Sequence, residues 1–388
     1  MINKKYAAAT YLLAILGAFA TVHFQLTSLI EISEQISCWF VKFLKWISIP
    51  MIFLSVTSAA AGLNPKSSLS KLFSQLFKYT IFTTMLSAAT ALVLYLIIQP
   101  SLANAIDGNC TSSRMQISTS TYSICLIITL MSCALLSMII RYYDAKQPLK
   151  KTKAFIISSY NAVMFVIRKF FMLLPFAIWA FIVEFIVDLN TIDMAQFTRY
   201  LSIIVLANLI QALITLPLIL MAHRIKPLQL FKNLVPALST AFWSKSSSVA
   251  LPEAIRCSID RAKMDPEVAK FSLPLCITLN MNACAAFILT TVLFISESNG
   301  VSFSPMMLCA WVVIATIAAI GNAGIPMGCY TLSGVILSYL GVPLVILGLI
   351  LPFYSLIDML ESAINVWSDG CVTAILNKKN KEKKEVKI

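Results

Sequence analysis

The chain has 388 residues, of which 59% are hydrophobic and 12% charged, and its formal net charge is +13. So few charges cannot give a folded domain of this length a hydrated surface, so the composition excludes a soluble globular protein and predicts an all-α polytopic membrane protein. The basic residues lie at the ends of apolar stretches and not on one face, which argues against a nucleic-acid partner.

Apolar stretches long enough to cross a membrane, which takes about 20 helical residues, occur about eight times. They lie at about 7–23, 36–63, 76–99, 120–141, 155–187, 200–221, 268–295 and 345–376. Basic residues before the first stretch, between the fourth and fifth, and in the tail predict a multi-pass protein of the cell (inner) membrane with both termini cytoplasmic. We expect a solvated, disordered tail with membrane lipid, through its anionic headgroups, as a weak partner.

The start of the chain is also similar to a signal peptide, with a cleavage site at Ala18–Ala20, but we favour a first span that serves the same targeting purpose. The ten cysteines show no CxxC spacing and most fall in apolar runs. We expect them to be small buried hydrophobic residues and not a disulfide framework or a metal site. His23 and His223 are the only histidines, which argues against a histidine metal centre.

Two further apolar segments, at about 232–257 and 304–341, are interrupted near their centres. Serines and Lys245 cut the first, and the glycines and proline of 321–328 cut the second, so each arm is too short to span. Non-helical backbone at membrane depth is tolerated only around a polar cavity, so we expect two re-entrant hairpins whose tips meet there. The first tip suits a carboxylate, because it offers hydroxyls and N–H groups at a helix N-terminus. Alternatively, its serines only cap the second arm.

Polar residues also interrupt the seventh predicted span, where Thr278, Asn280 and Asn282 follow Pro274. They could be interhelical hydrogen-bond partners. We favour an unwound helix whose carbonyl and amide oxygens join Asp369 in a cage for a small hard cation. Oxygen ligands of low total charge suit sodium better than calcium.

The eighth predicted span carries one polar stripe. At about 100° per residue its members fall within an arc of about 100°. They are Asp358, Glu361, Ser362, Asn365 and Asp369. Carboxylates inside a spanning helix indicate a functional site. The alternative, carboxylates at a helix end facing headgroups, fits Asp369 best.

Five motifs in order resemble those of the dicarboxylate/amino acid:cation symporter family, which contains glutamate transporters and archaeal aspartate-transporting homologues. They are FVKFLKWISIPMIFLSV, SKSSSVALP, LPLCITLNMN, GNAGIPMG and INVWSDG. The resemblance covers nearly the whole chain. It implies a sodium-coupled amino acid symporter, built as a homotrimer of inverted repeats in which an elevator-type transport domain moves against a scaffold.

The resemblance also implies domain boundaries. The scaffold would contain spans one and two at 1–75 and spans four and five at 101–199. The transport domain would contain span three at 76–100 and, at 200–376, spans six to eight with both hairpins. A basic tail would follow at 377–388.

Carried over by motif, Ser247 and Asn365 would contact the substrate's α-carboxylate region, Asp358 its α-ammonium group, and Ser362 would add a hydrogen bond. The second hairpin's tip, 324–328, would form the gate. The remaining residues of the implied substrate site are Lys245, Ser246, Ser248, Met281, Cys284, Gly324, Ile325, Pro326 and Glu361.

The resemblance implies two sodium sites and leaves a third in question. The first would use Asp369, Asn365 and Asn280. The second would use backbone around Thr278 and the second hairpin. Its members are Cys276, Thr278, Ala319, Gly321 and Asn322. Thr83 and Thr84 match the third site, but Asn282 stands where the family has aspartate, so we expect weak sodium binding there or none.

Three residues bear on the substrate. Glu361 occupies the position of the arginine that pairs with an acidic substrate side chain, and Cys284 replaces a threonine there. If Lys245 pairs with Glu361, the site suits a neutral amino acid, which we favour; if Lys245 points elsewhere, Glu361 could recruit a cationic one. An acidic substrate would need Lys245 to replace the arginine. Protons could join or replace sodium.

The sequence leaves two other classes of protein to consider, an enzyme and a channel. Lys245 beside Ser246 is similar to the Ser–Lys dyad of a membrane hydrolase, but an enzyme of that kind would leave the stripe of the eighth span unexplained. A channel could not concentrate its solute. We therefore expect a transporter and not an enzyme.

Overall fold

The computed structural model describes residues 4–40, 43, 70–100, 150–170, 173–187, 194–320 and 327–385. These parts of the chain are helical and contain no β-strand, which confirms the all-α prediction for them. Most of the second predicted span, the whole fourth one and the tip of the second hairpin at 321–326 lie outside the described residues.

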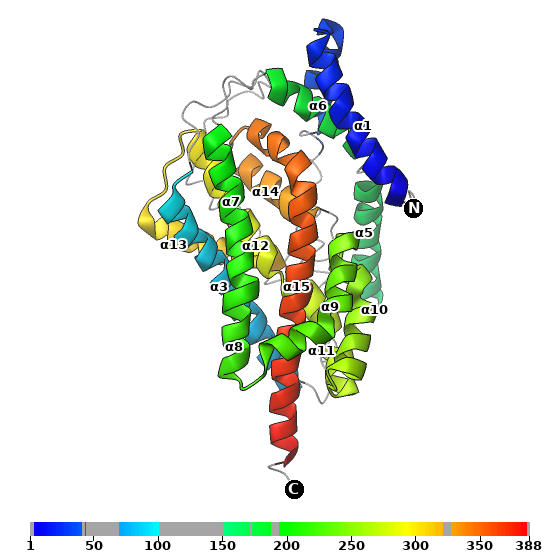
Figure 1. Ribbon diagram of the computed structural model, residues 1–388, viewed down its shortest axis with the longest axis vertical. Helices are drawn as coiled ribbons and strands as arrows, with labels where there is room; N and C mark the ends of the chain where they lie inside the picture. Colours follow the sequence, from blue (N-terminus) through cyan, green and yellow to red (C-terminus); the bar gives the residue numbers. More distant parts are fainter. Residues whose placement is uncertain are drawn as a thin grey trace.

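Thirteen α-helices carry labels, and residues 27–40 form a further helix. The labelled helices are α1 (Lys4–His23), α3 (Ser70–Ile98), α5 (Lys150–Phe170), α6 (Leu174–Val187), α7 (Met194–Ile210), α8 (Leu216–Ala222), α9 (Pro227–Ser244), α10 (Ser247–Arg256), α11 (Pro266–Leu279), α12 (Asn282–Ser298), α13 (Pro305–Ile320), α14 (Gly328–Tyr339) and α15 (Val345–Glu385). The π-helical turns η2 (Gln211–Thr215) and η3 (Cys257–Arg261) follow α7 and α10. Figure 1 shows α15 along the length of the molecule, with α1 and α6 crossing at the end opposite the C-terminus.

Four helical stretches among the described residues are long and apolar enough to cross a membrane. They are Leu72–Ile98, Met194–Ala222, Pro266–Ser298 and Ile346–Glu382. They correspond to the third, sixth, seventh and eighth predicted spans. The total of eight spans stays a prediction.

Helix α12 forms the centre of the molecule. All but one of its residues are buried, and the helix packs against α3, α7, α13, α14 and α15. The aromatic rings of Tyr200 on α7 and Phe294 on α12 stack with their centroids 4.5 Å apart. A helix that is apolar all round is stable only where other helices surround it, which explains why the seventh span lies inside the bundle.

The first interrupted segment is a helical hairpin. Helix α9 ends at Ser244, Lys245 adopts a left-handed conformation (φ 54°, ψ 37°), and α10 begins directly after Ser246. The two arms pack against each other and against α15. The arms α13 and α14 bracket the second interruption. Re-entry into the membrane stays a prediction for both segments.

The fifth predicted span covers parts of α5 and α6, and residues 171 and 172 between these helices lie outside the described residues. Two expectations are wrong in detail. The tail is helical as far as Glu385 and not disordered, since lysine and glutamate are good helix formers. Cys38 is disulfide-bonded, whereas we expected the cysteines to be small buried hydrophobic residues and not a disulfide framework.

Candidate functional site

The seventh span unwinds between α11 and α12, as the sequence predicts. Asn280 (φ −103°, ψ 73°) and Met281 (φ −104°, ψ 62°) leave the helical region, and the Asn280 N–H group still donates to the Cys276 carbonyl at 2.7 Å. Asparagine side chains compete with the backbone for hydrogen bonds, so paired asparagines after a proline favour this break. The break places both amides at the centre of the bundle.

The Asn280 side chain joins the break to α15. Its Nδ2 atom donates to the Asp369 carboxylate at 3.0 Å and to the Ser368 hydroxyl at 2.8 Å. The hydroxyl of Thr83 on α3 donates to Asn280 Oδ1 at 3.1 Å. All four side chains are buried. Residues from two helices and the break therefore meet in one polar cluster.

Asn282 extends the cluster at the start of α12. Its Oδ1 atom accepts from the hydroxyl groups of Thr84 at 2.7 Å and Thr83 at 3.3 Å, and its Nδ2 atom donates to Ser368 at 2.6 Å. The Asn282 amide therefore occupies the position where the family has a carboxylate, and both its oxygen and its nitrogen are hydrogen-bonded there. We call Thr83, Thr84, Asn280, Asn282, Ser368 and Asp369 the polar cluster.

Asp369 is the one acidic member of the polar cluster. It is 1% exposed, and its Oδ2 atom has no hydrogen-bond partner. A buried ionised oxygen without a partner is strongly unfavourable unless positive charge lies nearby. Amide, hydroxyl and carboxylate oxygens are ligands of a hard cation such as sodium, so the polar cluster fits that ion.

Asn365 lies one helical turn before Asp369 and faces the other side of the break. Its Oδ1 atom accepts from the Ala283 N–H group at 3.0 Å, and its Nδ2 atom lies 3.5 Å from Cys284 Sγ and 3.7 Å from Met281 Sδ. The structure therefore brings together Asn365, Met281 and Cys284, all assigned to the substrate site. Among the described residues, no hydrogen bond joins Asn365 to Asp369.

The hairpin tip approaches the part of α15 that carries Asp358. The Lys245 ammonium donates to the hydroxyl of Ser355, one turn before Asp358, and attracts the Asp358 carboxylate. The predicted approach of the first hairpin tip to the polar stripe is present in the structure.

Glu361 lies away from Lys245. It is 1% exposed, its Oε2 atom accepts from the Tyr354 hydroxyl at 3.4 Å, and the thiol of Cys329 on α14 hydrogen-bonds to it. The sequence left open whether Lys245 pairs with Glu361. This pair is absent from the structure, because the hairpin tip reaches α15 at Ser355, about two turns closer to the N-terminus of α15 than Glu361.

The serines of the tip cap α10. The Ser246 hydroxyl accepts from the Val249 N–H group at 3.4 Å, as in a helix N-cap, while Ser247 is half-buried and Ser248 exposed. The capping interpretation is therefore confirmed for Ser246. Carboxylate binding by Ser247 stays a prediction.

A model of the sodium:dicarboxylate symporter family matches residues 7–379. The chain belongs to this family. Its members are transporters, which agrees with the expectation that the protein is not an enzyme.

Several relatives of the chain are named amino acid transporters. Excitatory amino acid transporter 3 of Mus musculus is 30% identical over 187 residues, which are 48% of this chain and 36% of the relative. Neutral amino acid transporter A of Homo sapiens is 30% identical over 185 residues, 47% of this chain and 35% of the relative. Neutral amino acid transporter B(0) of Rattus norvegicus is 31% identical over 179 residues, which are 46% of this chain and 32% of the relative. The aligned region thus spans about a third of each relative's length.

The second sodium site of the family is only partly within the described residues. Helix α11, which carries Cys276 and Thr278, packs against α13, which ends near Ala319. The Thr278 hydroxyl donates to the Leu275 carbonyl at 2.8 Å within its own helix. Five predicted residues lie outside the described ranges: Gly321, Asn322, Gly324, Ile325 and Pro326.

Sequence reasoning missed two members of the chain's polar interior. Ser368 accepts from both asparagine amides; it lies at about 280° on the helical wheel, just outside the polar arc. Gln211 begins the π-helical turn η2 and donates to the Thr83 carbonyl at 3.2 Å. The signal for it in the sequence is a single glutamine within the apolar sixth span. In the structure, the π-helical turn that begins at this glutamine is a second sign, because such turns often mark functional positions.

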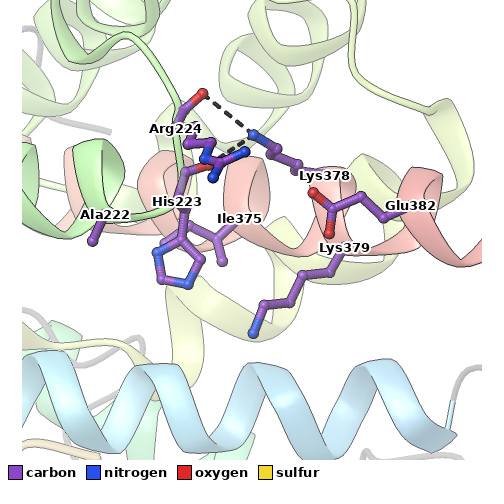
Figure 2. A pocket seen from close by; sticks show the side chains of 7 residues that line it. All are labelled: Ala222, His223, Arg224, Ile375, Lys378, Lys379 and Glu382. Atoms are coloured by element: carbon purple, nitrogen blue, oxygen red, sulfur yellow. Dashed lines mark hydrogen bonds between the residues drawn. The ribbon is translucent and has the colours of Figure 1, made fainter.

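A separate hollow of about 230 Å³ lies toward the C-terminal end of α15 (Figure 2). Lys378 donates to the His223 carbonyl at 2.9 Å, and Lys379 reaches the hydroxyl of Tyr79 on α3 at 2.6 Å. Lys379 lies ten residues after Asp369, about 15 Å along the helix. The hollow is therefore distinct from the polar cluster.

Proposed function

We propose that the chain is a sodium-coupled symporter that carries an amino acid across the cell membrane. The observation that carries this proposal is the buried Asp369 carboxylate, whose partnerless oxygen lies among amide and hydroxyl oxygens at a break between two helices. Family membership supports sodium as the coupling ion. Assembly as a trimer and elevator movement remain expectations from the resemblance, and cytoplasmic termini remain an expectation from the positions of the basic residues.

Asp358 supports an α-ammonium group in the substrate. It lies on the face of α15 that the hairpin tip approaches, where the ammonium of Lys245 attracts it. The Asp358 carboxylate therefore attracts positive charge at this position. The α-ammonium of an amino acid would take the place of the lysine ammonium.

Glu361 argues against an acidic substrate side chain. Its Oε1 atom has no hydrogen-bond partner, and Lys245 points to Ser355 instead. A second carboxylate beside it would be repelled strongly where water is excluded. The acidic-substrate alternative requires Lys245 to take the role of the arginine. The hydrogen bond of the Lys245 ammonium to Ser355, away from Glu361, weighs against that role.

The charges favour a cationic amino acid over a neutral one. Asp358, Glu361 and Lys245 sum to a formal charge of −1, and a cationic amino acid, which carries +1, neutralises it. A neutral amino acid would leave Glu361 unpaired. This reverses the preference drawn from the sequence, which depended on a Lys245–Glu361 pair.

The test is uptake by purified protein in liposomes. With sodium outside and potassium inside, and the membrane potential held at zero, labelled lysine or arginine should accumulate above its external concentration. Replacing external sodium by potassium should abolish accumulation, and Asp369→Asn is the matched variant that should lose it while keeping the size of the side chain. Equal uptake in both salts would refute sodium coupling, and accumulation of glutamate in preference to lysine and neutral amino acids would refute the substrate class.

A further inference from the structure

Two thiols and a carboxyl group meet in a buried cluster beside Asn365. Cys284 on α12, Cys329 on α14 and Glu361 on α15 each offer one ligand atom, and these atoms lie within 4.8 Å of one another. The three residues are 4%, 3% and 1% exposed. We call them the thiol–carboxylate cluster. Their positions in the sequence, 45 and 32 residues apart, give no sign of this arrangement.

One atom of the thiol–carboxylate cluster lacks a partner. The Cys329 thiol interacts with both the Glu361 carboxylate and the Cys284 thiol, and Tyr354 donates to Glu361 Oε2. Glu361 Oε1 is fully buried and has no hydrogen-bond partner. Such an atom indicates either strain or a ligand that the site is built to take.

We propose that the thiol–carboxylate cluster binds one soft divalent cation, Zn²⁺ or Cd²⁺, through Cys284 Sγ, Cys329 Sγ and a Glu361 oxygen. Thiolate sulfur selects soft or borderline metals, whereas an all-oxygen site selects hard ones. Each thiol releases its proton to solvent as its metal–sulfur bond forms. The polar cluster, which has only oxygen and nitrogen atoms, is thus chemically distinct from this site.

The distances suit a tetrahedral ion. Zinc–sulfur bonds of about 2.3 Å place two sulfurs about 3.8 Å apart, so the ligand atoms need to approach by no more than about 1 Å. Three protein ligands leave a fourth position for water or another small ligand. The bound ion would join α14, which follows the second interruption, to α12 and α15.

A second carboxyl group lies near the thiol–carboxylate cluster on α15. Asp358, one turn before Glu361, is partly exposed, and the two carboxyl groups influence each other electrostatically. Their combined negative charge favours a cation at this end of the site. A metal ion held by Glu361 would also occupy the space proposed for the substrate side chain.

The experiment is a titration of the purified full-length chain with cadmium chloride, without sodium or amino acid, read by the ultraviolet charge-transfer absorbance of cadmium–thiolate bonds. The absorbance of Cys284→Ser is subtracted from that of the wild type at each cadmium concentration. The difference should saturate at one Cd²⁺ per chain. Cys284→Ser and Cys329→Ser should each weaken the binding at least about 10-fold. Cys257→Ser, buried elsewhere, and Cys309→Ser, exposed, are matched controls that should leave it unchanged.

A second measurement tests the proposal even if a cysteine variant fails to fold. Zinc should raise the Tm of the wild type by at least about 2 °C at saturation, and Glu361→Gln, which keeps both thiols, should reduce that shift. Wild-type absorbance retained in Cys284→Ser and Cys329→Ser, or an unchanged zinc shift in Glu361→Gln, would overturn the proposal. Because neither readout uses sodium or transport, this result is independent of the uptake experiment.

Discussion

At the scale of single residues, the account depends on which side chains the apolar helices bury together. The sequence predicts the polar stripe of α15 well, because helical spacing alone places its five members on one face. It does not predict their partners. Ser368 joins the two asparagines, and Cys329 reaches Glu361, only through the packing of helices that are far apart in the chain.

Asp369→Asn tests the ion site at this scale. The substitution removes the negative charge and keeps the size of the side chain, so the sodium concentration that gives half of the maximal thermal stabilisation should rise at least about 10-fold. The measurement is Tm against sodium concentration at constant ionic strength. Asp265→Asn, at the half-buried N-cap of α11, is the matched control. An unchanged sodium dependence would remove Asp369 from the site.

Glu361→Arg tests the substrate side-chain site. An arginine there would attract an acidic side chain and repel a cationic one, so competition by aspartate and glutamate should increase and competition by lysine should decrease. Glu361→Gln is the control, because it removes the negative charge without adding a positive one. No gain for acidic amino acids with arginine at 361 would place Glu361 outside the substrate site.

Lys245→Met tests the tip of the first hairpin. The lysine ammonium is attracted to Asp358, so it competes with a substrate ammonium for that carboxylate. Its removal should tighten amino acid binding several-fold, measured as Kd by calorimetry at saturating sodium. Lys245→Arg, which keeps the charge, should bind like the wild type. Weaker binding in Lys245→Met would instead mean that Lys245 contacts the substrate.

At the scale of helices, polar residues in apolar runs locate the interruptions. The serine tip and the Asn280 break are both visible in the sequence, because few other causes place such residues at membrane depth. The helical tail was missed because a run of lysines was taken to favour solvation over helix formation.

Gly370→Ala tests the packing of α15 against α9. A Cβ atom at 370 would lie 2.3 Å from Leu234 Cδ1, and Leu234 is only 1% exposed. Overpacking of this kind destabilises by about 1–3 kcal/mol, so the Tm should fall by several degrees. The double variant Leu234→Ala/Gly370→Ala should be more stable than the two single changes predict by addition. Strict additivity would show that the two helices are not in close contact there.

At the scale of the whole molecule, the structure brings an ion-binding cluster and a substrate face onto one helix. Asp369 and Asp358 are eleven residues apart on α15, about 17 Å along the axis, and Asn365 lies between them and contacts the break. An ion that orders the break therefore also orders the Ala283 N–H group and Asn365. Sodium and substrate should stabilise the same arrangement, and coupling of this kind is reciprocal.

The most direct test of this coupling is the Kd of the amino acid measured over a range of sodium concentrations, at constant ionic strength, for the wild type and Asp369→Asn. The account predicts that the wild-type Kd falls at least about 5-fold as sodium rises from zero to saturation, and that Asp369→Asn loses this dependence. A Kd that does not change with sodium in the wild type would contradict it.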